Sequence, residues 1–258
     1  YVFRTSDGGA TYGQVAKLRA SDARGGDNFG HDVAINSGTI VVGARNNRDR
    51  GASTGSAYVF RTTDGGATYS QVKKLLAADI TAGDRFGQNV ATDGENVAIC
   101  GGGAVYIYTD DGGTWSQVAK LVASDGVSIG SSNSGFLAID GATVAVSGGG
   151  AVYIFTDGGG TWSQVAKLMA SDGVSISRPA ISGDVVVAGA SGDDSFANNA
   201  GSAYVFSLHA PTSQPTVSPT TLQPTVSFLP TLVPTSFPTP APTTAVPSPL
   251  PSPWPTPA

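Results

Sequence analysis

Cysteine, histidine and glutamate are almost absent from this sequence of 258 residues. It contains one cysteine, Cys100, and two histidines, His31 and His209. A lone cysteine forms no intrachain disulfide, and these three side chains cannot complete a tetrahedral zinc site. Glu95 is the only glutamate, and His31 is the only histidine before residue 207. A hydrolase built on a Ser–His–Asp triad therefore has little support, and we interpret Glu95 as a turn residue and His31 as a variable polar position.

Long apolar runs and clusters of basic residues are missing as well. No segment reaches about 18 uninterrupted apolar residues, so no membrane span is expected. The net charge is −5, and no basic stripe is present that could neutralise phosphates, so we expect no nucleic-acid partner. All charged residues precede Ser207, whereas all prolines except Pro179 follow it. The chain therefore divides into residues 1–206, which can bury a core, and a Pro/Thr/Ser-rich segment, residues 207–258.

A short aromatic motif, Tyr followed by Val or Ile and then Phe or Tyr, recurs along the first segment. It begins at Tyr1, Tyr58, Tyr106, Tyr153 and Tyr204. Self-similarity at a period of about 50 residues indicates a repeat architecture. We divide the segment into four repeats, residues 1–57, 58–105, 106–152 and 153–203, followed by a closing strand, residues 204–206.

Each repeat has the pattern of four short strands joined by tight turns. In the first repeat these strands are expected at residues 1–5, 11–18, 29–35 and 39–44, and the last of them is apolar enough to be buried on both faces. Four such strands in about 50 residues are the unit of a β-propeller blade. The sequence therefore predicts an all-β, β-propeller-type fold, either a closed ring or an arc of a larger propeller.

One motif in each repeat combines a Phe-Gly pair with two later apolar strands. The first repeat has Gly26-Asp27-Asn28-Phe29-Gly30, then Val33-Ala34-Ile35 and Val41-Val42-Gly43-Ala44. The second has Gly83-Asp84-Arg85-Phe86-Gly87, and the other two depart further, the fourth keeping only Val187-Ala188-Gly189-Ala190. This pattern resembles the FG-GAP repeat of integrin α-subunit propellers and of secreted algal and bacterial proteins. The resemblance implies a propeller that displays its loops for binding.

A second motif, Asp-x-Gly-x-Thr-aromatic, occurs at residues 7–12, 64–69, 110–115 and 157–162. It resembles the Asp-box of sialidases and related propellers. The aspartate can accept amide protons of its own turn, and the aromatic ring can pack beneath the hairpin. Since the motif is copied in every repeat, we interpret it as structural, although the same resemblance leaves a glycoside hydrolase as an alternative.

Calcium is the one cofactor that the resemblance suggests. Integrin-type repeats often hold this ion in an acidic loop after the Gly-Ala strand, where hard oxygen ligands cluster. The corresponding loop of the fourth repeat offers Asp193, Asp194 and Asn198. Their spacing does not match the family's loop, so an ordinary polar turn is the alternative.

The Pro/Thr-rich segment cannot pack a core and favours an extended polyproline conformation. Ser/Thr-rich sequence with proline is typical of a glycosylated stalk, and similar segments follow FG-GAP domains in algal surface proteins. We therefore expect a non-catalytic adhesion or recognition scaffold that is secreted or held at the cell surface or wall and binds a protein or glycan. An extracellular sialidase-like glycoside hydrolase and a purely structural cell-wall protein are the alternatives.

Overall fold

The computed structural model describes residues 1–131, 136–198 and 200–209, all of which belong to one compact unit, residues 1–212. The regular structure of these residues consists of β-strands alone, paired antiparallel within each sheet. No helix among them is long and apolar enough to cross a membrane. The predicted Pro/Thr/Ser-rich tail lies outside the described residues from position 210 onward.

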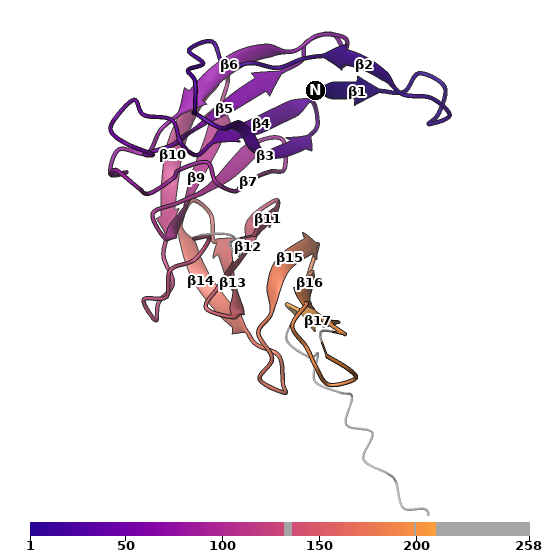
Figure 1. The fold of residues 1–258 in the computed structure, drawn as a ribbon, viewed down its shortest axis with the longest axis vertical. Coiled ribbons are helices and arrows are strands. Elements are labelled where there is room, and N and C mark those ends of the chain that lie inside the picture. The colour runs from indigo at the N-terminus through magenta and orange to yellow at the C-terminus, as the bar shows by residue number, and fades with distance from the viewer. Residues whose placement is uncertain (132–135, 199, 210–258) are drawn as a thin grey trace, which may run out of the picture. The chain divides into compact units, whose positions relative to one another are not determined.

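Seventeen strands form one hairpin and four sheets, which follow one another in chain order (Figure 1). The N-terminal hairpin consists of β1 (Val2–Arg4) and β2 (Gly13–Ala16). Blade I consists of β3 (Phe29–Asn36), β4 (Thr39–Ala44), β5 (Ser56–Arg61) and β6 (Ser70–Leu75). Blade II consists of β7 (Val90–Thr92), β8 (Asn96–Gly101), β9 (Ala104–Asp111) and β10 (Thr114–Leu121). Blade III consists of β11 (Leu137–Asp140), β12 (Thr143–Gly148), β13 (Ala151–Asp157) and β14 (Trp162–Leu168). Blade IV consists of β15 (Ser177–Ser182), β16 (Val185–Ala190) and β17 (Ser202–Ser207).

These sheets confirm the predicted all-β propeller arrangement of four blades. Their boundaries are offset by two strands from the sequence repeats, because the Tyr-containing strand is the third strand of its sheet and pairs with the strand before it as well as with the one after it. Tyr58, for example, lies opposite Val42 on one side and Lys74 on the other. One sequence repeat therefore contributes to two neighbouring blades.

The core lies between blades as well as within them. Strand β4 is buried along its whole length, as its continuous apolar run predicts. Strand β7 contacts β3 and β4 of the preceding blade, β11 contacts β7 and β8, and β15 contacts β11 and β12. Each blade thus packs its first strand against the blade before it, which is the blade-to-blade packing of a propeller.

The Phe-Gly and Gly-Ala motifs meet at the junction between blades I and II. The ring of Phe86 is fully buried and packs edge-on against Tyr106, with ring centroids 5.4 Å apart. A Cβ atom added to Gly43 would lie 1.9 Å from the carbonyl oxygen of Gly87. Gly87 itself has a φ of 84°, which favours glycine. The two glycines are therefore required for the close approach of successive blades.

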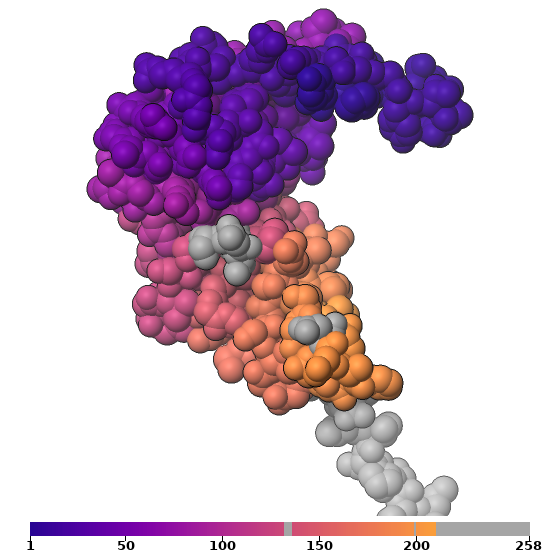
Figure 2. All heavy atoms as spheres, in the orientation of Figure 1, coloured from indigo at the N-terminus to yellow at the C-terminus, as the bar shows by residue number. Residues whose placement is uncertain are grey.

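The hairpin and blade IV are both incomplete sheets. Among the described strands, β2 pairs only with β1, and β17 pairs only with β16, so strand pairing does not join the two ends of the unit. In Figures 1 and 2 the indigo hairpin and the orange strands of blade IV are separate.

Candidate functional site

Three polar arrangements could carry function in this unit: the Asp-box turns, the loops that follow the second strand of blades I and IV, and a cavity at the turns that join the first two strands of each blade. The sialidase resemblance depends on the Asp-box turns.

The Asp-box aspartates bind their own turns. Asp7 Oδ1 accepts a hydrogen bond from the Thr11 amide at 2.9 Å, and Asp64 Oδ1 accepts the equivalent bond from Thr68 at 2.9 Å. Hydrogen bonds from Thr11 lower the pKa of Asp7 well below its usual range, and those from Thr68 do the same for Asp64. These carboxylates are therefore held as anions by backbone amides and threonine hydroxyls of the same hairpin.

The aromatic ring of the Asp-box does not pack beneath the hairpin in every copy. Trp115 is buried and lies under the guanidinium group of Arg61, at 5.0 Å from its ring centroid. Tyr12 is instead 66% exposed, because its hairpin has no complete blade beneath it. The prediction of a packed ring is thus confirmed for Trp115 and wrong for Tyr12.

The predicted calcium loop follows β16. Asp193 is buried, and its Oδ1 accepts hydrogen bonds from the amide and the hydroxyl of Ser195. These bonds lower the pKa of Asp193. Asp194 and Asn198 are both exposed, and no group of three acidic, histidine or cysteine side chains suited to a metal exists among the described residues. Calcium at Asp193, Asp194 and Asn198 stays a prediction, with one of its three oxygen donors already engaged by its own loop.

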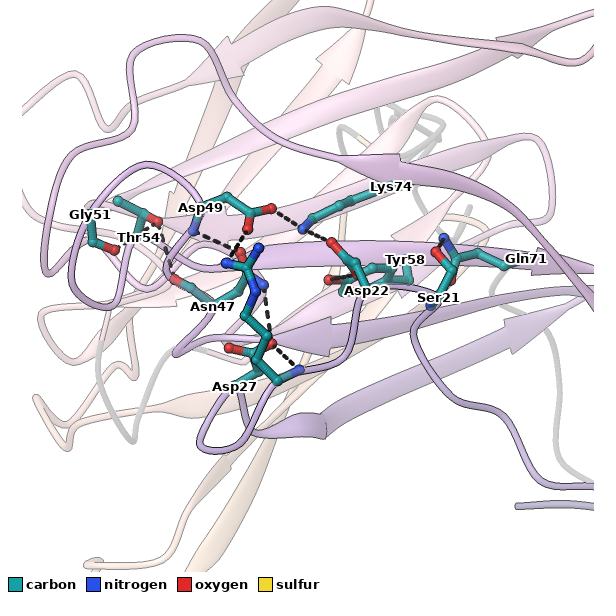
Figure 3. A network of polar contacts seen from close by, with 11 residues as sticks. Ser21, Asp22, Asp27, Asn47, Asp49, Gly51, Thr54, Tyr58, Gln71 and Lys74 are labelled. Atoms are coloured by element: carbon teal, nitrogen blue, oxygen red, sulfur yellow. Dashed lines mark hydrogen bonds and ion pairs between the residues drawn. The ribbon is translucent and has the colours of Figure 1, made fainter.

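The corresponding loop of blade I follows β4 and is also held by hydrogen bonds and ion pairs (Figure 3). Asp27 is buried and accepts hydrogen bonds from the Arg24 amide at 3.0 Å and the Asn47 side-chain amide at 3.3 Å. Asp49 forms ion pairs with Lys74 and with Arg24. The Asn47 and Asp49 side chains of this loop are therefore already engaged by neighbouring protein groups.

Next to it, Figure 3 shows a contact that recurs between blades, which we call the interblade latch. A latch consists of a tyrosine on the third strand of a blade, a lysine on its fourth strand and an aspartate from the loop that leads in from the preceding sheet. In blade I, the Tyr58 hydroxyl donates to Asp22 at 2.8 Å, and the Lys74 ammonium binds Asp22 and lies 5.2 Å from the Tyr58 ring centroid. Partial burial would raise the pKa of Asp22, but the bonds from Lys74 and Tyr58 outweigh it and lower the pKa.

Blades II and III contain the same latch. In blade II, Lys120 binds Asp79 and lies over the Tyr106 ring at 5.3 Å. In blade III, Asp125 accepts bonds from the Tyr153 hydroxyl at 2.9 Å and from Lys167 at 2.7 Å. This arrangement was not predicted from the sequence. Its sequence signal is a Lys-Leu pair with an aspartate four residues after the leucine, which recurs in each repeat.

An opening that contacts three blades lies at the turns between their first two strands. It is a cavity of about 630 Å³ lined by the β3–β4, β7–β8 and β11–β12 turns. Three carboxylates line it: Asp93, Glu95 and Asp140. Glu95 is exposed at its turn, as the sequence analysis expected, whereas Asp93 caps the amides of Glu95 and Asn96.

Arg61 fixes one wall of this cavity. Its guanidinium group pairs with Asp110, donates to the Gly94 carbonyl oxygen at 3.2 Å and stacks on Trp115. On another side, Asp140 accepts a hydrogen bond from the Gly183 amide at 2.6 Å, which links blades III and IV. The cavity is thus a rigid polar depression whose carboxylates can accept hydrogen bonds from a ligand.

Comparison with known proteins supports the repeat assignment. The model of the FG-GAP repeat matches residues 12–60, 69–113 and 162–206, which together make up more than half of the chain. Each match runs from the fourth strand of one sheet to the third strand of the next. The third repeat, residues 106–152, contributes most of the unmatched stretch between the second and third matches.

Solved structures resemble the chain at low identity, and no curated protein matches it. Hsv2 of Kluyveromyces lactis is 12% identical with a TM-score of 0.43, over 72% of this chain and 47% of that one. Myxococcus xanthus glutaminyl cyclase is 14% identical with a TM-score of 0.37, over 63% and 61% of the two chains. Pseudomonas aeruginosa periplasmic gluconolactonase is 12% identical with a TM-score of 0.36, over 72% and 70%. The chain spans about half the length of Hsv2. With its repeats matched over more than half of its length, the chain belongs to the FG-GAP repeat family.

Proposed function

We propose that the chain is a non-catalytic recognition scaffold that binds a protein or glycan ligand through the cavity at the β3–β4, β7–β8 and β11–β12 turns. The observation that carries this proposal is the convergence of three carboxylates from two blades on one rigid polar depression. Hydroxyl groups of a glycan, or amide and ammonium groups of a protein, are the donors that such acceptors bind. FG-GAP repeats are typical of extracellular proteins, and a secreted or cell-surface location is part of the proposal.

The alternative of a sialidase-like hydrolase has less support. The aspartates that suggested it are distributed over four hairpins, and Asp7 and Asp64 are bound within their own turns. A glycosidase needs two carboxyl groups facing one substrate across the scissile bond. In the cavity, Asp93 caps its own turn and Asp140 binds the Gly183 amide, so both act as structural acceptors.

The binding proposal is tested with the whole chain immobilised and exposed to panels of extracellular polysaccharides and proteins. Retention of a ligand is expected, and Glu95→Gln should weaken it at least tenfold, because one cavity acceptor loses its charge while its exposed side chain leaves the fold intact. Asp111→Asn, an exposed carboxylate outside the cavity, is the matched control and should bind normally.

Three results would contradict the proposal. Absence of retention for every protein and polysaccharide would favour the purely structural wall protein. Turnover of fluorogenic glycosides, lost on changing one aspartate, would favour the hydrolase instead. Ligand retention that Glu95→Gln and Asp111→Asn affect equally would move the site away from the cavity.

A further inference from the structure

Blade IV departs from the other blades in its lead-in segment, the residues that precede the first strand and carry the Phe-Gly motif elsewhere. In blade II, the Phe86 N–H group donates to a loop carbonyl oxygen of blade I at 2.8 Å, and Gly87 follows it. In blade IV, the Ile176 N–H group donates in the same way to the Gly150 carbonyl oxygen of blade III at 2.9 Å, but Ser177 follows it. Blade IV therefore has a side chain where blade II has glycine.

Glycine at this position allows neighbouring blades to pack closely. A Cβ atom added to Gly87 would lie 2.2 Å from the Ser56 carbonyl oxygen of blade I. One added to Gly130, the equivalent residue of blade III, would lie 2.3 Å from the Cys100 Sγ of blade II. Neither contact admits a side chain unless the neighbouring blade moves. Serine at position 177 therefore prevents blade IV from approaching blade III in the same way.

The backbone of blade IV also takes a different path at this position. Gly87 and Gly130 have φ values of 84° and 63°, whereas the φ of Ser177 is not positive and that of the next residue, Arg178, is 53°. Strand β15 pairs with β16 at Ser177 and again from Ala180, with a shift of register between them. Irregularities of this kind re-aim side chains and are frequent next to functional sites.

A cavity of about 530 Å³ lies at this junction, and we call it the serine pocket. Its lining consists of residues 147–150 of blade III and residues 174–177 and 191–192 of blade IV. In blade III, a Cβ atom added to Gly148 at the end of β12 would lie 2.8 Å from the Ser128 carbonyl oxygen of its own lead-in segment. In blade IV, one added to Gly192 after β16 would meet no atom within 4 Å. The pocket is therefore open on the side of blade IV, and its volume suits a small ligand.

The serine pocket is polar but carries no charged side chain among its described lining residues. The Ser147 hydroxyl is already bonded to the Phe136 carbonyl oxygen. The hydroxyl groups of Ser175, Ser177 and Ser191 form no hydrogen bond with the described residues. Each of these three hydroxyls can donate one hydrogen bond and accept two, and Val174 adds an apolar surface beside them.

We propose that the serine pocket binds a neutral sugar unit of a glycan. The hydroxyl groups of a sugar ring both donate and accept hydrogen bonds, as the serine hydroxyls do, and the C–H groups of the ring can pack against Val174. A phosphate, sulfate or carboxylate group would favour a cationic partner, which the described lining does not supply. In a repeated structure, a local departure from the common pattern is expected at a functional site.

The serine pocket is separate from the cavity lined by Asp93, Glu95 and Asp140. Strand β12 has the β11–β12 turn, which lines that cavity, at one end and the β12–β13 turn, which lines the serine pocket, at the other. The two openings therefore lie at opposite ends of the strand. They also differ in chemistry, because carboxylates line one and hydroxyl groups line the other.

Isothermal titration calorimetry of the full chain with neutral disaccharides of glucose, galactose, mannose and xylose, up to about 10 mM, tests the proposal. We expect saturable binding of at least one disaccharide at one site per chain. Ser177→Ala and Ser191→Ala should each weaken this binding about fivefold, because each removes one hydrogen bond to the sugar. Gly192→Leu should weaken it at least tenfold by filling the pocket, and the open space around Gly192 and its φ, which is not positive, allow this substitution.

Ser163→Ala is the matched control, because it removes the hydroxyl of an exposed serine on β14 outside the pocket and should leave the affinity unchanged. Absence of binding for every neutral disaccharide would overturn the proposal. Binding that Ser191→Ala and Gly192→Leu leave unchanged would also overturn it, and Ser191 is exposed, so the test does not depend on a variant that misfolds.

Two further measurements separate this site from other sources of binding. Sialylated and sulfated disaccharides should bind no more tightly than their neutral counterparts, and tighter binding of the charged sugars would contradict the proposal. Glu95→Gln changes the other cavity and should leave the sugar affinity unaltered. Loss of sugar binding in this variant would place the sugar in the carboxylate-lined cavity and overturn the assignment to the serine pocket.

Discussion

The tyrosine hydroxyl of each latch is the smallest group whose removal tests how the blades are held together. Tyr153 is fully buried and its hydroxyl binds Asp125 at 2.9 Å. Tyr153→Phe should lower the free energy of unfolding by about 1 kcal/mol, the net value of a typical intramolecular hydrogen bond. Urea denaturation measures the change. Tyr12→Phe, on an exposed ring, should change stability by less than about 0.5 kcal/mol, and equal effects of the two substitutions would contradict the latch.

The same latch predicts how stability depends on acid. A hydrogen bond from Lys167 is the main reason that the pKa of Asp125 is lowered to about 2, and the Val127 amide and Tyr153 hydroxyl add to it. A carboxyl group with a lowered pKa in the folded state stabilises it above the unfolded value of about 3.9 and loses this contribution as the pH falls further. Stability should therefore decline between about pH 4 and pH 2. Asp125→Asn should make that decline shallower in acid titrations followed by circular dichroism, and an unchanged slope would show that Asp125 carries none of it.

Two residues show where sequence reasoning succeeds and fails at this scale. Cys100 is fully buried, as its position in an apolar run predicts, and burial raises the pKa of its thiol. Lys74 could not be recognised from the sequence as part of a latch, because it binds an aspartate from the loop that leads in from a different sheet. A contact between residues about 50 positions apart becomes visible only once the blades are stacked.

At the scale of the elements, the glycines of the Phe-Gly and Gly-Ala motifs allow neighbouring blades to approach each other closely. A Cβ atom at position 43 would lie 1.9 Å from the Gly87 carbonyl oxygen, a distance that requires backbone movement. Gly43→Ala should therefore destabilise the fold by about 3 kcal/mol or more, in the range of severe overpacking. Gly13→Ala is the control, since no atom lies within 4 Å of its added Cβ and its φ is not positive. Thermal unfolding should separate the two, and similar midpoints would contradict the close packing of these motifs.

Strand identity could be predicted from alternation, apolar runs and turn residues, and β4 and β8 are buried as their sequences indicate. The boundaries of the sheets could not be predicted, because a repeat in the sequence has no intrinsic starting point. Whether the unit starts at Tyr58 or at Phe29 depends on which strands pair, and that is a long-range property. The cavity itself could not be predicted beyond a set of loops displayed for binding, since its wall residues Asp93 and Asp140 come from different blades.

At the scale of the whole molecule, a recurring latch of tyrosine, lysine and aspartate holds successive blades together, and a polar cavity at the turns between their first two strands is available for a ligand. The Asp-boxes at Asp7 and Asp64 bind their own threonines. Glu95 stands apart, because it is exposed and lines the cavity.

The measurement that tests this account most directly is ligand retention by the whole chain, compared among the unchanged protein, Glu95→Gln and Asp111→Asn. Glu95 is exposed and lines the cavity, whereas Asp111 is an exposed carboxylate outside it. We expect retention that Glu95→Gln weakens at least tenfold and that Asp111→Asn leaves unchanged. Equal retention by the two variants would contradict the account.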